Sequence, residues 1–224
     1  MNQPLYAVIT GDIKKSTRLP AADLVRLPSV LKEIFNAFGK TPEPKGRLLK
    51  YSIFRGDSFQ LVIEPESVLE AMLFIRAGLR AAYPGSVAKA VDCRLAAAIG
   101  HIENLTDNIT ESTGEAFTLS GRLMEDIKKS FLMAIITPYP SATSELNTEL
   151  ALCDKLMSRW TYSQALLLPK ILNGEMQTSI ADESGISQAA VAKKIQAMGW
   201  QAIEMLLQRY LHLCQQMTID VQHK

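Results

Sequence analysis

This sequence has few cysteines and no long apolar runs. These two absences argue against a disulfide-bonded secreted protein and against a membrane-spanning protein. The chain has 224 residues but only 3 Cys, namely Cys93, Cys153 and Cys214, and none belongs to a CxxC pair. Such spacing is typical of free thiols in a reducing compartment. No apolar run approaches the ~18 residues of a membrane-spanning helix, and the N-terminus lacks the basic segment of a secretory signal. We therefore expect a cytoplasmic protein whose cysteines are buried and unpaired.

An excess of charge of one sign is also missing. The 24 Lys and Arg residues are balanced by 23 Asp and Glu residues, which leaves a net charge of +1. This balance gives no overall signature of nucleic-acid or membrane binding, so any such function must come from a local patch. With 47% hydrophobic and 21% charged residues, the composition is that of an ordinary globular protein. The length suits one medium domain and one small domain.

The first 140 residues alternate between strand-like and helix-like patterns. The expected elements, in chain order, are strand Leu5–Ile9, helix Ala21–Phe38, strands Leu48–Phe54 and Ser58–Ile63, a helix that Pro65 opens and Tyr83 ends, strand Asp92–Ile102, an exposed mobile loop Glu103–Thr113, helix Glu115–Lys129 and strand Phe131–Thr137. Pro28 should break the first helix or lie in its first turn. This order predicts an α+β domain, residues 1–140, with the split βαβ sheet of ferredoxin-like proteins.

A hairpin within Ser52–Ile63 carries the main chemical clue of this domain. Gly56 and Asp57 favour a tight turn between its two strands, which places a carboxylate at the hairpin tip. A second carboxylate, Asp12, ends the first strand. If the sheet brings these strand ends together, the two side chains can bind one metal ion. The alternative is that Asp57 only shapes the turn.

Beyond Pro138–Ser144, which we interpret as a domain boundary, every patterned segment is helical. The expected helices of residues 141–224 are Glu145–Trp160, Ser163–Leu172, Thr178–Ser184, Ser187–Met198 and Gln201–Gln216. The third and fourth fit a helix-turn-helix, because Ala181 is small where the helices cross, Gly185 permits the turn, and Val191 anchors the second helix. Ser187 is a suitable N-cap for that helix.

The second helix of this pair should present one polar face to solvent. The residues of this face are Gln188, Ala189, Ala192, Lys193 and Gln196, and the candidate DNA-binding residues also include Ser187 and Lys194. Gln pairs with adenine in the major groove, Ala packs on a thymine methyl group, and Lys reaches phosphate. Residues 161–224 contain 5 basic and 5 acidic residues, so one copy should bind DNA weakly and a homodimer would be needed. The alternative is a helical hairpin used only for packing.

Four segments of the first domain resemble motifs of class III nucleotide cyclases. Asp12–Thr17 (DIKKST) is similar to the D-I-x-x-S-T metal loop, and Gly56–Phe59 (GDSF) to the second metal hairpin and to the G-D-x-F turn of diguanylate cyclases. Cys93–Gly100 (CRLAAAIG) resembles V-R-x-G-I-H-x-G, and Gly114–Glu125 (GEAFTLSGRLME) resembles G-x-x-V-N-x-A-x-R-L. Over nearly its whole length the chain resembles the SatD family, which has T-G-D-I near the N-terminus and F-x-G-D-x-F-Q at the hairpin.

The resemblance implies a metal and nucleotide site. Asp12, Asp57 and the carbonyl oxygen of Ile13 would hold Mg²⁺ or Mn²⁺, which prefer oxygen ligands. Arg122 would stabilise charge on a transferred phosphoryl group. The basic loop Lys14, Lys15, Ser16 and Thr17 lies beside the metal ligands in sequence and is our candidate phosphate site.

Two positions depart from the cyclase pattern. The Asn that orients ribose is replaced by Thr118, and the Lys that selects a purine is replaced by Ile53, which cannot read a base edge. Cyclases of this type also complete each site across a symmetric dimer, so the resemblance implies that Arg122 faces Asp12 and Asp57 of a second copy.

Three functions remain open at this point. The first is a DNA-binding regulator whose cyclase-like domain binds metal and nucleotide as a sensor, or dimerises. The second is an active nucleotide cyclase or nucleotidyltransferase that uses metal bound by Asp12 and Asp57. The third is a scaffold in which both carboxylates are only turn residues.

Overall fold

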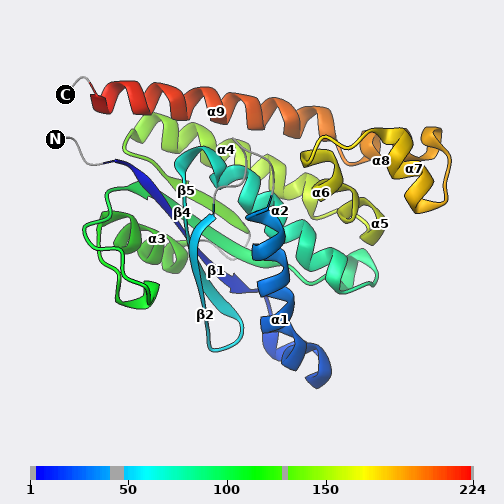
Figure 1. Ribbon diagram of the computed structural model, residues 1–224, viewed down its shortest axis with the longest axis horizontal. Helices are drawn as coiled ribbons and strands as arrows, with labels where there is room; N and C mark the ends of the chain where they lie inside the picture. The colour runs from blue at the N-terminus through cyan, green and yellow to red at the C-terminus, as the bar shows by residue number, and fades with distance from the viewer. Residues whose placement is uncertain (1–3, 41–47, 128–130, 223–224) are drawn as a thin grey trace.

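A five-stranded sheet forms the centre of the protein (Figure 1). The computed structural model describes residues 4–40, 48–127 and 131–222. The strands are β1 (Tyr6–Ile13), β2 (Leu48–Phe54), β3 (Ser58–Ile63), β4 (Cys93–Gly100) and β5 (Met133–Ile136). They lie in the order β2-β3-β1-β4-β5, with β4 and β5 parallel and the other neighbours antiparallel. This is an α+β protein, and β1 lies at the centre of its sheet.

The connections follow the expected order of strand, helix, hairpin, helix, strand, helix and strand. Helix α1 (Ala21–Phe38) joins β1 to β2, α2 (Val68–Ala82) joins β3 to β4, and α3 (Glu115–Asp126) joins β4 to β5. Each helix crossing allows the chain to return to the sheet as a new strand. The end expected for the third helix, Lys129, falls outside the described residues.

The two faces of the sheet are covered by different elements. Alternate side chains of β1 point to opposite faces. Ala7, Ile9 and Ile13 belong to the main core with residues of α1 and α2, whereas Val8 packs with Ala116 of α3 in a smaller cluster. Asp12 lies at an even position of β1 and therefore shares the α3 face with Val8.

The segment from Glu103 to Thr113 is mostly exposed, as its polar sequence predicts, but it is fixed to the sheet at one point. Backbone hydrogen bonds join Asn104 to Thr113 in both directions. A short turn at Ile109–Glu111 then brings the Ile109 side chain, 2% exposed, against Val8 and Val62. The burial of Ile109 therefore anchors an otherwise polar segment. Its mobility stays a prediction.

Helix α1 continues through Pro28, contrary to expectation. Proline lacks a backbone N–H and normally disrupts a helix interior. Here Leu27, Val30 and Leu31 on either side of it are buried in the core. Because these side chains pack in the core on both sides of Pro28, the helix continues through it. Their burial offsets the lost backbone hydrogen bond.

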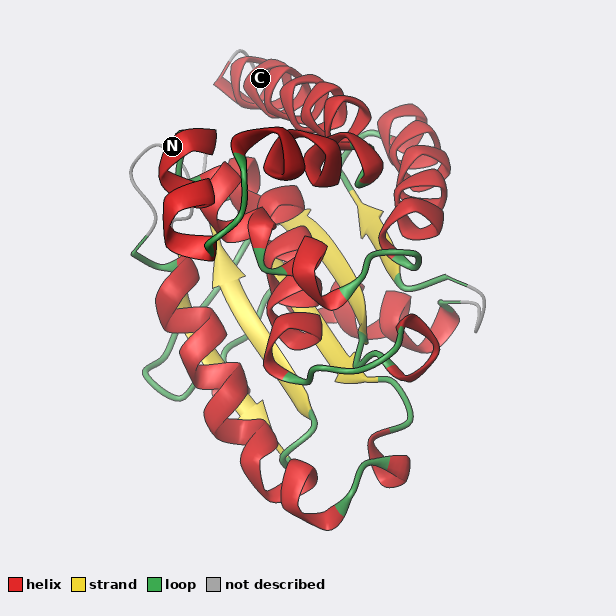
Figure 2. Ribbon diagram, turned by 90° about the vertical axis from the view of Figure 1, so that its right-hand side faces the viewer, coloured by secondary structure: helices red, strands yellow, loops and turns green. Residues whose placement is uncertain are grey.

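The helices after β5 are α4 (Pro140–Met157), α5 (Tyr162–Ala165), α6 (Leu167–Leu172), α7 (Gln177–Ser184), α8 (Gln188–Ala197) and α9 (Trp200–Gln222). Helix α4 begins at Pro140, inside the segment expected to be a boundary, since Pro is favourable at the first helical position. Asn147 of α4 then donates to and accepts from the backbone of Ile135 in β5. Figure 2 shows helices packed around the strands of the sheet, with the C-terminal end of the chain at the top of the view. The division at residue 140 stays a prediction, but both parts share one continuous core.

A buried ionic network joins α2, the start of β4 and α4. The Arg76 guanidinium, fully buried, donates to both oxygens of Asp92 at 2.8 and 2.9 Å and also pairs with Asp154. Arg80 donates to Asp92 at 2.8 Å and to the carbonyl oxygen of Trp160 at 3.3 Å. Buried charges are tolerated only when they are paired and hydrogen-bonded in this way.

All three cysteines are buried, as expected, and none forms a disulfide with another described residue. Burial raises the pKa of Cys153 and Cys214 to about 12 and that of Cys93 well above its usual value. These thiols therefore stay protonated and unreactive at neutral pH. None of the helices in the described ranges is both long enough and apolar enough to span a bilayer.

Candidate functional site

The end of β1 and the β2–β3 hairpin tip meet at one edge of the sheet. Asp12 is the register partner of Ser58, the residue directly after Asp57. The backbone N–H of Ile13 donates to the carbonyl oxygen of Asp57 at 2.9 Å. Asp12 near the end of β1 is therefore close in the backbone to Asp57 in the adjoining hairpin loop. Whether the carboxylates share a metal ion stays a prediction.

The hairpin turn has three residues, as the bounds expected for its two strands imply. Phe54 pairs with Ser58 across the hairpin, so Arg55, Gly56 and Asp57 form the loop. Arg55 and Gly56 both have positive φ, 51° and 83°, a conformation that is rare for a side chain as long as arginine. Asp57 is the last residue of this loop, directly before β3 and next to the backbone of Ile13.

Asp12 is held by a residue that the sequence patterns did not single out. Arg94 lies directly opposite Asp12 in the β1–β4 ladder, and its Nη2 donates to Asp12 Oδ2 at 2.6 Å. Both side chains are about one third exposed, 32% for Arg94 and 29% for Asp12. The Arg94 position is visible in the sequence, but only the register of the two strands shows that it faces Asp12.

Asp57 is held by the turn that follows β1. The Ser16 hydroxyl donates to Asp57 Oδ2 at 2.6 Å, and Ser58 lies near Oδ1 at 3.4 Å. Ser16 is buried at the start of a short 3₁₀ turn, Ser16–Arg18, and Lys15 before it has a φ of 59°. The hydrogen bond fixes the loop after β1 to the hairpin tip, which fits the metal-loop resemblance of both segments.

The remaining polar side chains of the basic loop point to solvent. Lys14, Lys15 and Thr17 are exposed, whereas Ser16 is buried. The backbone of Lys14 is fixed because its N–H donates to the carbonyl oxygen of Asp92 at 2.9 Å. Two mobile ammonium groups on a fixed loop beside Asp12 can attract an anion.

A row of polar side chains continues from Asp12 along the α3 face of the sheet. Thr10 donates to Ser120 of α3 at 3.1 Å, and Gln60 of β3 donates to Thr10 at 3.2 Å. Ser120 in turn donates to the carbonyl oxygen of Phe117. Polar residues in a sheet interior facing a helix are costly unless they pair. Only the strand register and the packing of α3 bring these three side chains together.

The residues of α3 that the resemblance selects lie on its outer side. Thr118 and Arg122 are both exposed and are one helical turn apart. The Thr118 hydroxyl donates to the carbonyl oxygen of Gly114 at 3.3 Å. Within one chain the described contacts of Asp12 and Asp57 go to other residues, so the expected meeting with Arg122 across a dimer stays a prediction.

Ile53, which takes the place of a purine-selecting lysine, packs against the main core. Its side chain is therefore engaged in the interior and cannot bind a base edge. Lys50, three residues earlier on the same strand, donates to Asp107 at 2.9 Å and to the carbonyl oxygen of Thr106 at 2.8 Å.

Helices α7 and α8 pack around the predicted small residues. Ile180, Ala181 and Val191 are buried at 0%, 4% and 0% exposure, and Gly185 has a φ of 65° in the turn. Ser187 caps α8 by accepting a hydrogen bond from the N–H of Ala190 at 3.2 Å. The five residues expected on the solvent face of α8 are all exposed, namely Gln188, Ala189, Ala192, Lys193 and Gln196, and Ala197 at the end of the helix is exposed as well. Lys194 is half-buried.

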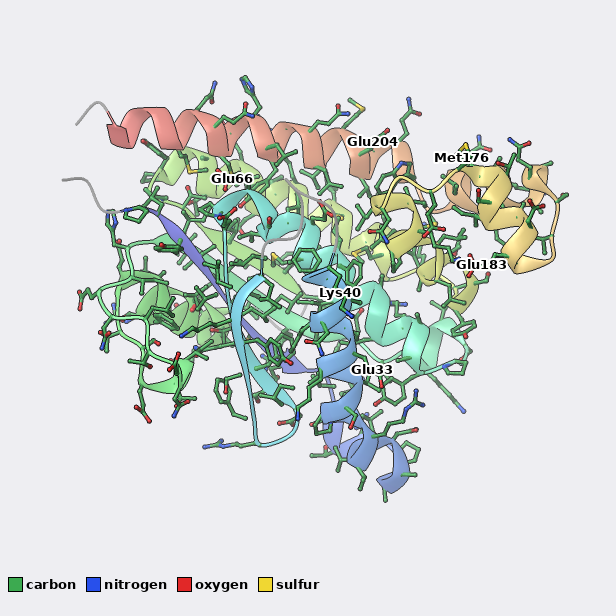
Figure 3. All side chains as sticks on the ribbon, in the orientation of Figure 1. Glu33, Lys40, Glu66, Met176, Glu183 and Glu204 are labelled. Carbon is green, nitrogen blue, oxygen red and sulfur yellow. The ribbon has the colours of Figure 1, made fainter. Side chains whose placement is uncertain are left out.

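The α7–α8 pair forms one end of the molecule, beyond the edge of the sheet (Figure 1). Its attachments are specific. The indole of Trp160 donates to the carbonyl oxygen of Met198, which follows α8, at 3.0 Å. Lys170 of α6 pairs with Glu183 of α7, and Figure 3 shows Glu183 and Met176 at this end of the molecule. These contacts hold α7 and α8 against the preceding helices and leave one face of α8 exposed to solvent.

The carboxylate pair fits a metal that keeps much of its water. Among the described residues there is no group of three or more His, Cys, Asp or Glu side chains able to hold a metal ion. Mg²⁺ needs only one or two carboxylates when water and phosphate oxygens complete its octahedral shell. Two half-exposed Asp side chains beside a basic loop meet that requirement, so Mg²⁺ or Mn²⁺ fits here better than a metal that needs a protein cage.

Comparison with known proteins gives only distant structural similarity. No protein family and no curated protein matches the chain. A bacterial light-regulated adenylyl cyclase has a TM-score of 0.41 and 17% identity, covering 60% of this chain and 44% of that one. The guanylyl cyclase domain of the RhoGC fusion protein from the aquatic fungus Blastocladiella emersonii has a TM-score of 0.40 and 15% identity, covering 56% and 77%. Similarity this low carries no argument about function, and membership of the SatD family stays a prediction.

Proposed function

We propose that this protein is a DNA-binding regulator in the cytoplasm, and that its sheet domain binds a divalent metal ion with a nucleotide polyphosphate. The observation that carries the proposal is the exposed face of α8. Its five solvent-facing residues sit on a capped helix whose opposite side is fixed by Val191. A second helix of a pair presented in this way can enter the major groove of DNA.

The side chains of that face have the chemistry of base and backbone recognition. Gln188 and Gln196 can pair with a base edge, and Ala189 and Ala192 can approach a thymine methyl group. Lys193 and, at the edge of the face, Lys194 can reach phosphate. Ser187 is the N-cap of the helix. It is also exposed, so we include it in the proposed DNA-binding set.

The sheet domain is proposed as the sensor. Asp12 and Asp57, with the Ile13 carbonyl oxygen, would hold Mg²⁺ or Mn²⁺, and Lys14, Lys15, Ser16 and Thr17 would contact phosphate. Support comes from the ion pair that holds Asp12 near the end of β1 and from the hydrogen bond that holds Asp57 in the adjoining hairpin loop. A metal there would supply charge neutralisation for a polyphosphate.

A catalytic reading is the second candidate. Arg122 is exposed on α3, so its side chain is free to reach the Asp12 and Asp57 site of a second copy of the chain. This favours nucleotide cyclisation or nucleotidyl transfer across a homodimer. Thr118 would then take over part of the work of the missing Asn. Against catalysis, Ile53 is engaged in the core instead of reading a base. We therefore favour binding over turnover.

Two experiments test the proposal separately. Selection from a random DNA library with the full-length protein should enrich a two-fold symmetric sequence, as expected for a homodimer. A thermal-shift series with nucleoside triphosphates should raise the melting temperature only when Mg²⁺ or Mn²⁺ is present. Failure to enrich any sequence contradicts the DNA function, and a melting temperature that ignores metal and nucleotide contradicts the sensor site.

A further inference from the structure

The ion pair between Arg94 and Asp12 places a permanent cation on a proposed metal ligand. The two residues are register partners in the β1–β4 ladder, and the Arg94 Nη2 donates to Asp12 Oδ2 at 2.6 Å. The guanidinium cannot lose its proton at any ordinary pH. A metal ion on Asp12 would therefore have to share one carboxylate with a fixed positive charge.

Binding a metal ion and Arg94 to the same carboxylate is unfavourable, whereas breaking the ion pair between Arg94 and Asp12 costs little. A divalent ion and a guanidinium on one carboxylate lie only a few ångströms apart, where like charges repel strongly. The existing pair is partly exposed, with side-chain exposures of 32% and 29%, and ion pairs of this kind contribute little to stability. Metal binding should therefore displace the Arg94 side chain and leave it in need of an anion.

An anion has an obvious place near the displaced side chain. Arg94 lies two residues beyond Asp92, whose carbonyl oxygen holds the backbone of Lys14 at 2.9 Å. The exposed Lys14 and Lys15 side chains start from this point. A guanidinium that joins two ammonium groups makes a cluster suited to phosphate oxygens, because Arg binds them in bidentate geometry.

The geometry points to Arg94 as an exchangeable counter-ion. It holds Asp12 while no metal is present, and it binds an oxygen of a polyphosphate once a divalent ion takes Asp12. This inference rests on the proposed metal and nucleotide function, and it adds that the metal ion binds before the polyphosphate. The metal ion makes the anion site, so tight anion binding requires metal.

The test is a set of calorimetric titrations with Mn²⁺ and inorganic tripolyphosphate, separately and together. In wild type, each should tighten the binding of the other. Arg94→Gln should bind Mn²⁺ alone up to about fivefold more tightly, because no ion pair has to be broken. The same variant should lose most of the mutual enhancement, since the displaced cation is gone.

Asp12→Asn imitates the released state without metal. It should bind tripolyphosphate alone about tenfold more tightly than wild type, through charge-assisted hydrogen bonds of the freed Arg94. Loss of one negative charge also favours any anion, so the double variant Asp12→Asn with Arg94→Gln is needed. In a double-mutant cycle the gain should disappear when Arg94 is absent.

Arg55→Gln is the matched control. It removes one positive charge from the exposed hairpin tip, two residues from Asp57, and should change Mn²⁺ affinity by less than about twofold at physiological salt. Arg94→Lys tests geometry, because a lysine keeps the charge but not the bidentate contact. All variants are first checked for a wild-type circular dichroism spectrum.

The outcomes separate this inference from the function on which it rests. If wild type binds Mn²⁺ with tripolyphosphate, and Arg94→Gln behaves identically, the counter-ion role is wrong while the proposed site stands. The same holds if the Asp12→Asn gain persists in the double variant. If wild type binds neither ligand, both the site and the role of Arg94 are overturned.

Discussion

Trp160 and Met198 are joined by a hydrogen bond from the indole Nε1 to the backbone carbonyl oxygen, 3.0 Å long, although 38 residues separate them. Trp160 is 2% exposed and Met198 1% exposed. The bond links the segment between α4 and α5 to the end of α8. Because the carbonyl oxygen of Trp160 also accepts from Arg80 of α2, this residue connects the α7–α8 end of the molecule to the helices over the sheet.

Trp160→Phe should therefore destabilise the whole protein. The substitution leaves a buried carbonyl oxygen without its donor and a cavity beside it, which together cost about 2–4 kcal/mol. Urea unfolding followed by circular dichroism measures the loss. Trp200→Phe is the control, because Trp200 is only partly buried, and its cost should be clearly smaller. Equal costs for the two variants would contradict the role assigned to Trp160.

The buried network predicts a dependence of stability on pH. Burial alone would raise the pKa of Asp92, but Arg76 and Arg80 outweigh it and hold that pKa below its usual value. Asp92 therefore contributes stability above its unfolded pKa of about 4, and this contribution is lost as the pH falls through the native pKa. For Asp154, burial outweighs the attraction of Arg76 and raises the pKa. Its ionised form opposes folding, and this cost is relieved as the pH falls through the raised value.

Asp92→Asn should accordingly cost about 3–5 kcal/mol at pH 7, since it leaves Arg76 and Arg80 with an uncompensated buried charge. The difference from wild type should shrink below about pH 4, where Asp92 takes up a proton in the unfolded state before it does so in the native state. Urea titrations at neutral and acidic pH give both values. Asp107→Asn is the control, because Asp107 is exposed and its pair with Lys50 is on the surface; it should leave stability nearly unchanged. A constant difference at all pH values would contradict the assignment.

Local patterns in the sequence predicted those features that depend on neighbours along the chain. The order of strands and helices of the sheet domain follows from apolar periodicity. The packing of Ala181 and Val191 around the turn at Gly185 follows from their spacing. Cap and turn residues act within a few positions, so their effect can be recognised without knowing the fold.

Other features depend on which distant segments meet, and the sequence patterns missed them. Nothing near Arg94 indicates that it faces Asp12, because the pairing arises from the register of two strands 82 residues apart. The same is true of Arg76 and Asp154, which are 78 residues apart. The polar stretch around Ile109 gave no sign that this one side chain is buried against the sheet, because one residue makes no periodic pattern.

The close contact between Gly11 and Phe59 makes a further prediction. A Cβ atom at Gly11 would lie 2.2 Å from the Phe59 ring, which crosses β1 at this point. Gly11→Ala should therefore cost about 1–3 kcal/mol, as expected for overpacking in a core. Phe59→Leu should recover part of that loss in the double variant. Gly121→Ala is the control: no atom lies within 4 Å of its Cβ position in α3, so it should be neutral or stabilising by up to about 1 kcal/mol. Both are measured by chemical unfolding.

The exposed face of α8 predicts two different effects on DNA binding. Gln188 lies in the first turn of α8, where a side chain can reach a base edge, so Gln188→Ala should cost about 1–3 kcal/mol at the preferred site and relax its specificity. Lys193→Ala should weaken binding to all sequences about equally and flatten the dependence on salt, because one phosphate contact is lost. Gln215→Ala, on the exposed side of α9, is the control and should bind as wild type does. Fluorescence anisotropy with the selected sequence and a scrambled one, at several salt concentrations, separates the two effects. If Gln188→Ala weakened both DNAs equally, α8 would contact the backbone alone.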